Sequence, residues 1–191
     1  MPKIAIVYHS GYGHTKKQAL AVATGARSAG AEVEVVEAAD LHDPEQGPWD
    51  ALDAADAIIF GSPTYMGSVA GPFETFADAT SKRWFTQAWK DKLAAGFSCS
   101  SSFSGDKTGT LQRFVTLACQ HGMIWVSLGL MPGTPAHPDT DEDNLNRLGF
   151  YMGAGAQAGN DASPEEAPTN GDLATAHHLG RRVAEQAARM G

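Results

Sequence analysis

The segment that indicates the fold lies close to the start of the chain and reads Lys3-Ile4-Ala5-Ile6-Val7-Tyr8-His9-Ser10-Gly11-Tyr12-Gly13-His14-Thr15. Lys3 to His9 is a short apolar run, which is typical of a strand buried on both faces of a sheet. Ser10 to Thr15 follows as a loop. From Lys16 to about Ala29 the apolar residues recur at helical spacing, and Gly30 stands where a helix C-cap would be. The segment therefore predicts a strand, a loop and a helix in succession.

The remainder of the chain continues this alternation of short apolar runs and helical segments. We expect four more strands, at Glu32 to Glu37, Ala57 to Gly61, about Leu93 to Ser98, and Met123 to Leu128. Further helices are expected at Pro72 to Ala79, Thr110 to Gln120 and about Asp172 to Met190. Elsewhere we expect a loop with one weak helical turn around Pro44 to Asp50, and a long loop region after Leu130 that includes the Gly/Ala-rich stretch Gly149 to Ser163. Five parallel strands with helices on both faces form a doubly wound α/β fold of the flavodoxin type, with strand order 2-1-3-4-5.

Length and composition favour one folded domain, residues 1–191. Of the 191 residues, 42% are hydrophobic and 19% charged, an ordinary globular composition. The net charge of −8 makes nucleic acid and anionic membranes poor partners. No apolar run could span a bilayer, no signal peptide is evident, and two cysteines are too few for a disulfide framework. We therefore expect a cytoplasmic protein.

The loop Ser10 to Thr15 is a candidate phosphate site. It offers two hydroxyls, two glycines and the backbone N–H groups of a helix start, which together suit an anion. An ordinary strand-to-helix turn is the alternative interpretation. Hydrogen bonds to a charged group contribute about 1.5–3 kcal/mol each, whereas nanomolar affinity needs about 12 kcal/mol. We therefore expect a large planar group to contribute to binding.

Two more loops follow strands that should flank the same crevice. Gly61 to Pro72 contains glycines that allow a flat ring to approach the backbone, and Tyr65 could stack on such a ring. Cys99 to Asp106 offers four hydroxyls and a glycine, which could meet the polar edge of a heterocycle. Because ligands of doubly wound sheets bind beyond the carboxyl ends of the strands, we expect the three loops to converge on one site.

Several other sites are excluded by spacing. The dinucleotide fingerprint G-x-G-x-x-G fails because Lys16 stands where the third glycine is required, and no P-loop occurs. No serine has the G-x-S-x-G context of a hydrolase elbow. A mononucleotide therefore ranks above a dinucleotide or ATP.

No metal site is expected. His177 and His178 are adjacent on a helix, about 100° apart, so they cannot share one ion. An acidic stretch begins like a calcium loop, but Asn144 and Phe150 replace the glycine and glutamate that such a loop requires; the stretch contains Asp139, Asp141 and Asp143.

Three segments resemble the WrbA-type NAD(P)H:quinone oxidoreductases and related flavodoxin-like FMN reductases. They are Ser10-Gly11-Tyr12-Gly13-His14-Thr15, Gly61-Ser62-Pro63-Thr64-Tyr65-Met66-Gly67 with Ala70-Gly71, and Gln120-His121-Gly122-Met123. The resemblance covers nearly the whole chain. It implies FMN bound without covalent linkage, NAD(P)H as electron donor, and a homodimer or homotetramer with sites near the subunit contacts.

The resemblance also implies the site residues. The FMN phosphate would lie on Ser10, Gly11, Tyr12, Gly13, His14 and Thr15. The ring would lie between two groups of residues, Pro63, Thr64, Tyr65, Met66 and Gly67 on one side and Cys99, Ser100, Ser101, Ser102, Phe103 and Ser104 on the other. His121 would contact the cofactor from a neighbouring subunit, and the substrate would meet Tyr12, Trp84 and His121.

Our first hypothesis is therefore an FMN enzyme that transfers a hydride from NAD(P)H, through the flavin, to a quinone or similar acceptor. No obligatory catalytic side chain is needed because the flavin does the chemistry. Two alternatives remain open. The chain could be a one-electron carrier like flavodoxin, or a partner-binding protein with a vestigial site.

Overall fold

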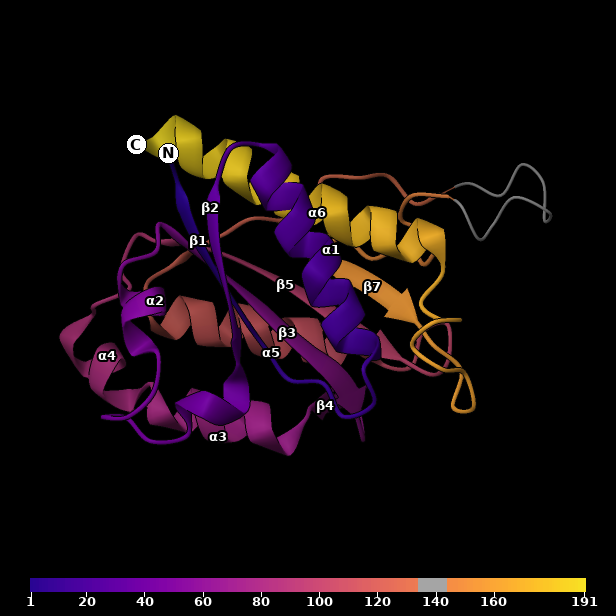
Figure 1. Ribbon diagram of the computed structural model, residues 1–191. Helices are drawn as coiled ribbons and strands as arrows, with labels where there is room; N and C mark the ends of the chain where they lie inside the picture. Colours follow the sequence, from indigo (N-terminus) through magenta and orange to yellow (C-terminus); the bar gives the residue numbers. More distant parts are fainter. Residues whose placement is uncertain (134–143) are drawn as a thin grey trace.

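The structure is a computed structural model that describes residues 1–133 and 144–191, and it is built around a parallel sheet with the strand order β2-β1-β3-β5-β6 (Figure 1). These strands are β1 Lys3–Tyr8, β2 Glu32–Glu37, β3 Ala57–Tyr65, β5 Leu93–Ser100 and β6 Ile124–Trp125. The label β4 belongs to Ser68–Val69, a short strand that pairs antiparallel with the end of β3. The predicted flavodoxin-type order 2-1-3-4-5 is therefore confirmed.

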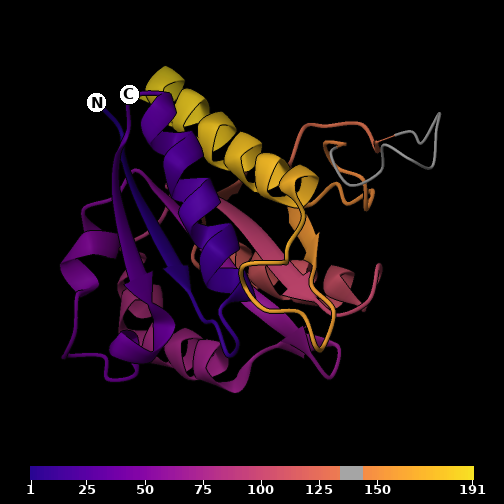
Figure 2. The ribbon, with the colours of Figure 1, turned by 45° about the vertical axis from the view of Figure 1, so that its right-hand side comes forward.

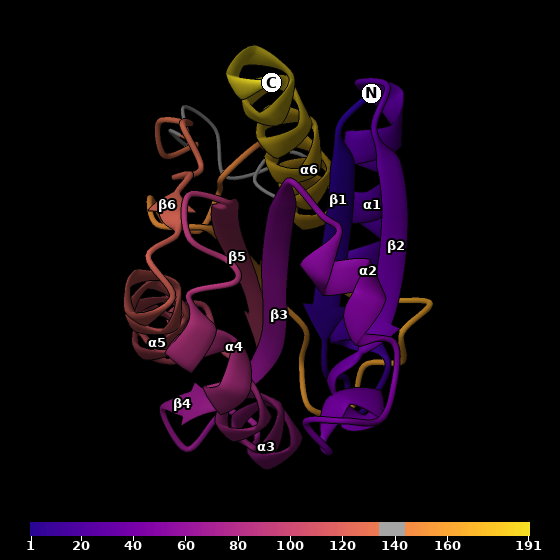
Figure 3. The same cartoon turned by 90° about the vertical axis from the view of Figure 1, so that its left-hand side faces the viewer.

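Helices cover both faces of the sheet. One face lies under α1 His14–Ser28 and α6 Asn170–Met190; the other lies under η1 Ala38–Leu41, α2 Trp49–Asp53, α3 Gly71–Ala79 and α5 Lys107–Gln120. In Figure 3, α2 lies in front of β1 and β2, and α1 lies behind them. Ile4 and Ile6 of β1 enter the core on one face, and Ala5 and Val7 enter the core on the other. This two-sided burial is why β1 reads as a continuous apolar run.

The predicted fifth strand, Met123 to Leu128, is wrong over most of its length. Only Ile124–Trp125 pairs with β5, at Leu93 and Ala94. The rest of that edge is formed by β7 Ala154–Gln157, which pairs with Phe97 to Ser100 and lies beside β5 in Figure 2. β7 was predicted to be part of a loop, because its mostly small residues carry no apolar periodicity. The calcium-like stretch at Asp139 to Asp143 lies outside the described residues.

Other boundaries differ in ways that matter for the site. α1 begins at His14 instead of Lys16, α5 begins at Lys107 instead of Thr110, and β3 runs on to Tyr65. The loops at the carboxyl ends of the strands are therefore shorter and tighter than predicted. The short helix α4, Ser81–Thr86, was not predicted, and none of its residues is buried. No helix among the described residues is both long and apolar enough to cross a bilayer.

α1 and α6 lie side by side in both Figures 1 and 2, and glycines allow their backbones to touch. A Cβ atom added at Gly25 would collide with the carbonyl oxygen of His177, and one added at Gly180 would collide with the carbonyl oxygen of Val22. Only glycine fits such a contact without moving a backbone. The crossing fixes α6 over the sheet.

We expect Gly180→Ala to lower the free energy of unfolding by about 1–3 kcal/mol, because overpacking at the crossing outweighs the gain in helix propensity of roughly 1 kcal/mol. Urea unfolding followed by circular dichroism measures the change. Gly71→Ala is the control, because a Cβ atom there would meet nothing within 4 Å. A Gly180→Ala variant as stable as the wild type would show that the close approach of the two helices does not require glycine at this position.

Candidate functional site

A crevice of about 420 Å³ opens at the carboxyl ends of β1, β3 and β5. It brings together residues of all three loops that the sequence analysis selected, namely Gly11, Tyr12, His14, Thr15, Pro63, Thr64, Tyr65, Met66, Cys99, Ser100 and Ser101. Three further lining residues, Ala158, Gly159 and Asn160, come from the segment after β7. The loops therefore converge at the place where doubly wound sheets bind their ligands.

The loop before α1 is folded around the Ser10 hydroxyl, which accepts hydrogen bonds from the amides of Gly13 and Lys16, both at 3.1 Å. Gly13 has a φ of 93°, a left-handed conformation that favours glycine. Within the described part of the chain, no partner is found for the amides of Gly11, Tyr12, His14 and Thr15 or for the Thr15 hydroxyl. These free donors at a helix N-terminus form a ready site for an anion.

The loop after β3 is a tight hairpin. β3 and β4 pair through Thr64 with Val69 and Tyr65 with Ser68, and the two intervening residues, Met66 and Gly67, have φ values of 47° and 81°. Positive φ at both positions matches the type I′ turn of hairpins. Met66 is unusual there because it has a side chain, which is fully exposed at the mouth of the crevice. The hairpin thus forms a well-defined rim.

Two tyrosines form one wall of the crevice. The rings of Tyr12 and Tyr65 meet edge to face with their centroids 6.5 Å apart. Burial, and then the neighbouring Tyr12 and Cys99, raise the pKa of Tyr65, so its phenol is neutral at physiological pH. A Cβ atom at Gly11 would collide with the Tyr65 hydroxyl, so glycine at that position lets the ring lie against the loop. The wall offers aromatic surface to a flat ligand.

The loop after β5 contributes only its first residues. Cys99, Ser100 and Ser101 line the crevice, whereas Ser102, Phe103 and Ser104 do not. Phe103 is 68% exposed, and the Arg147 guanidinium lies 5.8 Å from its ring centroid. Burial raises the pKa of the Cys99 thiol to about 12. Cys99 is therefore a neutral, small wall residue.

The segment after β7 was missed by the sequence analysis as part of the site. The amide of Ala158 donates to the carbonyl of Ser100 at 3.0 Å, and His14 Nε2 donates to the carbonyl of Ala162 at 2.8 Å. These bonds connect the segment to both β5 and α1. The available signal was the Gly/Ala-rich composition from Gly149 to Ser163, which is also compatible with an ordinary loop.

His121 and Trp84 lie apart from this crevice, at a separate cavity of about 260 Å³. α5 begins beside the crevice and has 14 residues, roughly 21 Å, before His121 follows it. The imidazole is buried against Trp89, with ring centroids 4.6 Å apart, and its Nε2 donates to the Thr80 hydroxyl at 2.9 Å. Burial lowers the pKa of His121 to about 4. Neither His121 nor Trp84 reaches the crevice of its own chain.

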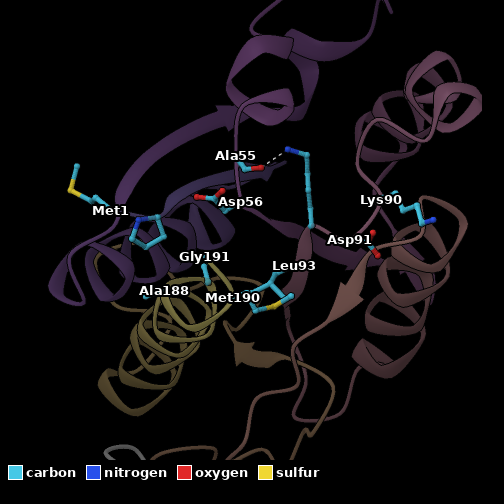
Figure 4. Close-up of a pocket in the computed structure, with 12 residues that line it drawn as sticks. Met1, Ala55, Asp56, Lys90, Asp91, Leu93, Ala188, Met190 and Gly191 are labelled. Atoms are coloured by element: carbon cyan, nitrogen blue, oxygen red, sulfur yellow. Dashed lines mark hydrogen bonds between the residues drawn. The ribbon is translucent and has the colours of Figure 1, made fainter.

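A cavity of about 650 Å³ lies at the opposite ends of the strands, between the two chain ends (Figure 4). Lys92, one of the charged residues that line it, donates to the backbone carbonyls of Asp53 and Ala55. It is therefore engaged in holding the chain together and offers no converging set of free donors. Within residues 1–133 and 144–191, no three His, Cys, Asp or Glu side chains are grouped as a metal site would require.

Comparison with known proteins agrees with this geometry. The family model described as NADPH-dependent FMN reductase matches residues 2–132. A protein named Flavodoxin FldP from Pseudomonas aeruginosa is 46% identical over 184 residues, 96% of each chain. An NAD(P)H dehydrogenase (quinone) from Archaeoglobus fulgidus is 33% identical over 209 residues and covers 100% of both chains.

Among solved structures, a flavodoxin, WrbA-like protein from Agrobacterium tumefaciens superposes with a TM-score of 0.75 at 41% identity, over 100% of both chains. A flavodoxin from the domain Archaea, at 21% identity and a TM-score of 0.63, shares the fold. The family match spans the loops after β1, β3 and β5 that line the crevice. The chain therefore belongs to the NADPH-dependent FMN reductase family.

Proposed function

We propose that this protein is an FMN-dependent oxidoreductase that takes a hydride from NAD(P)H and delivers two electrons to a quinone or similar small acceptor. The observation that carries the proposal is the crevice itself, which joins unpartnered donors at the start of α1 to a cavity walled by tyrosines. Membership of the FMN reductase family supports the cofactor. Relatives named NAD(P)H dehydrogenase (quinone) support the donor and the acceptor class.

The crevice fits FMN in both shape and donor chemistry. Its volume of about 420 Å³ lies within the usual range for cofactor sites. Ser10, Gly11, Tyr12, Gly13, His14 and Thr15 would hold the phosphate. The ring would lie between Pro63 to Met66 of the hairpin and Cys99, Ser100 and Ser101, the part of the predicted loop that lines the crevice. The lack of a Cβ atom at Gly11 and Gly13 keeps the phosphate loop close to Tyr65 and Pro164.

The side chains of the crevice bind and orient, and none is needed as an obligatory acid or base. FMN, when bound, carries a pair of electrons between two substrates. Tyr12 and Tyr65 give an aromatic wall against which a flat group can pack. The Ser100 and Ser101 side chains and backbone would meet polar edge atoms. One crevice that serves both substrates in turn would produce ping-pong kinetics.

We expect Thr15→Val to weaken FMN binding about ten-fold or more, because a hydrogen bond to a charged group contributes about 1.5–3 kcal/mol. Quenching of FMN fluorescence measures the dissociation constant. Thr24→Val is the control on the same helix, since the exposed Thr24 hydroxyl donates to the Leu20 carbonyl, away from the crevice. If the Thr15→Val variant bound FMN as tightly as the wild type, the proposal that this loop holds the phosphate would be wrong.

We expect NADH or NADPH, mixed anaerobically with the FMN-loaded protein, to bleach the flavin rapidly, and benzoquinone to restore its colour. Stopped-flow absorbance measures both steps. Initial rates with both substrates varied should give parallel double-reciprocal lines. Intersecting lines would count against a shared crevice.

The alternative is a one-electron carrier, and the relative named Flavodoxin FldP at 46% identity is the observation in its favour. A carrier docks on redox proteins and turns over no small substrate. Loaded flavin that stays yellow with both nicotinamide nucleotides, yet is reduced by a redox protein, would select the carrier. A protein that binds no FMN would leave the vestigial-site hypothesis.

We also propose that residues 1–191 act as one domain and assemble as a homodimer or homotetramer, in which Trp84 and His121 approach a neighbour's crevice and its substrate. Trp84 is 47% exposed on α4, next to Phe85 at 83%. Sedimentation velocity should give a dimer or tetramer for the wild type and a smaller species for Trp84→Glu. Leu20→Glu, with 49% exposure on α1, is the matched control. A monomeric wild type would overturn the proposal.

A further inference from the structure

A buried lysine stands directly behind the crevice wall. Lys107, the first residue of α5, is fully buried. Its Nζ donates to the Ser100 hydroxyl at 2.7 Å and to the Ser102 carbonyl at 2.9 Å. Lysine is almost never fully buried unless it is paired with an anion. Among the described residues, no carboxylate oxygen lies within 4.0 Å of this ammonium group.

The backbone is shaped to place the lysine there. Gly105 and Asp106 both adopt left-handed conformations, with φ values of 52° and 54°, and so turn the chain inward at the start of α5. A Cβ atom at Gly105 would collide with the Ser100 hydroxyl oxygen that Lys107 contacts. For Asp106 such a φ is uncommon. This turn directly precedes the buried Lys107 at the start of α5.

The surroundings do not neutralise the ammonium group. The carboxylate whose charge acts on Lys107 is that of Asp172, but both of its oxygens are bound by Arg147 at 2.8 Å, and one also accepts from the Gln157 backbone amide at 2.9 Å. The Asp172–Arg147 pair is itself buried. Burial keeps the Cys99 thiol neutral by raising its pKa to about 12. Lys107, Arg147 and Asp172 therefore leave one net positive charge.

This charge is one hydrogen bond away from the crevice. Ser100 lines the crevice and accepts a hydrogen bond from Lys107 Nζ. Burial lowers the pKa of Lys107 to about 8, an effect that the Asp172 charge partly offsets and the Arg147 charge adds to, so the ammonium form predominates at pH 7. A charge in a buried position acts over a longer distance than one exposed to water. The whole chain carries a charge of −8, so a local positive field is needed to favour an anion here.

We propose that Lys107, held behind Ser100 and left uncompensated by the Arg147–Asp172 pair, is the countercharge for the reduced flavin. The inference rests on the proposed function, because it requires FMN in the crevice. Reduction adds electrons to the ring, and a positive charge near the ring stabilises the resulting anion more than the neutral oxidised form. Lys107 acts through Ser100 and touches no substrate, so it is a positioning residue whose effect is on the redox potential.

The test compares Lys107→Met, which keeps an unbranched side chain one atom shorter and removes the charge, with Lys107→Arg, which keeps the charge. Lys82→Met, at an exposed surface pair with Glu45, controls for net charge. For each FMN-loaded protein we would measure the two-electron midpoint potential and the dissociation constant for oxidised FMN. We expect Lys107→Met to weaken the binding of reduced FMN about ten-fold more than that of oxidised FMN. This difference corresponds to a fall of about 30 mV in the two-electron midpoint potential. Lys107→Arg and Lys82→Met should stay near the wild type.

A Lys107→Met protein that binds FMN with the wild-type potential would overturn the inference and leave the proposed function intact. A wild type that binds no FMN would overturn both. If the substitution only loosened the loop, the binding of oxidised and reduced FMN would weaken equally and the potential would stay unchanged. That outcome also counts against the inference.

A measurement on the wild type decides the matter where Lys107→Met does not fold. With two electrons, the potential changes by about 59 mV per pH unit when two protons are taken up and by about 30 mV when one is. The slope of the potential against pH changes where the reduced flavin loses a proton. Because a positive charge favours the anionic form, we expect this change at a lower pH for the bound flavin than for free FMN. A change at the same or a higher pH would overturn the inference. His14→Asn removes the imidazole that lines the crevice and so tests whether that side chain, and not Lys107, causes the change of slope. The other titratable or charged groups facing the flavin or Lys107 are Tyr12, Tyr65, Cys99, Arg147 and Asp172.

Discussion

The constraint on which the structure depends is the burial of β1, β3 and β5 on both faces. Ile4 and Ile6 face one core while Ala5 and Val7 face the other, and Ile58, Ile59 and Phe60 of β3 divide in the same way. Parallel strands covered by helices on both sides leave no polar surface along their length. Polar and ligand-binding groups can then stand only at the strand ends. This constraint places the loop donors, the two tyrosines and the serines together at the carboxyl ends of the strands.

A second constraint is the buried ion pair between Arg147 and Asp172, with side chains 7% and 2% exposed. Removing two charges from water is costly, so such a pair is retained only where its geometry is good and its remaining atoms are bonded. Asp172 belongs to α6, and it also accepts from the Gln157 amide at the end of β7. The pair thereby joins α6, the segment around Arg147 and β7. It thus holds the end of β7, directly before the lining residues Ala158, Gly159 and Asn160.

The sequence predicted the strands and helices whose burial is local and periodic, and it failed where pairing at the sheet edge decided the outcome. Glu32–Glu37 was predicted with its observed bounds, because alternation and flanking residues define it. β7 was not, because three of its four residues are Ala or Gly and it is a strand only through its pairing with β5. The site loops were predicted because glycines and hydroxyls follow apolar runs. Ala158, Gly159 and Asn160 were missed because their segment meets the others only after folding.

By itself the sequence determined the fold class, the three loops and the resemblance to flavin enzymes, since each depends on residues close together in the chain. Tertiary structure alone decided which of those residues share a crevice. The Ser10 hydroxyl accepts two hydrogen bonds inside its own loop, and His121 lies at a separate cavity. The sequence did not single out Lys107, the first residue of α5. Its ammonium group is bonded nearby in sequence, to Ser100 and Ser102, but Phe150 and Asp172 approach it from distant parts of the chain, and no local pattern records such contacts.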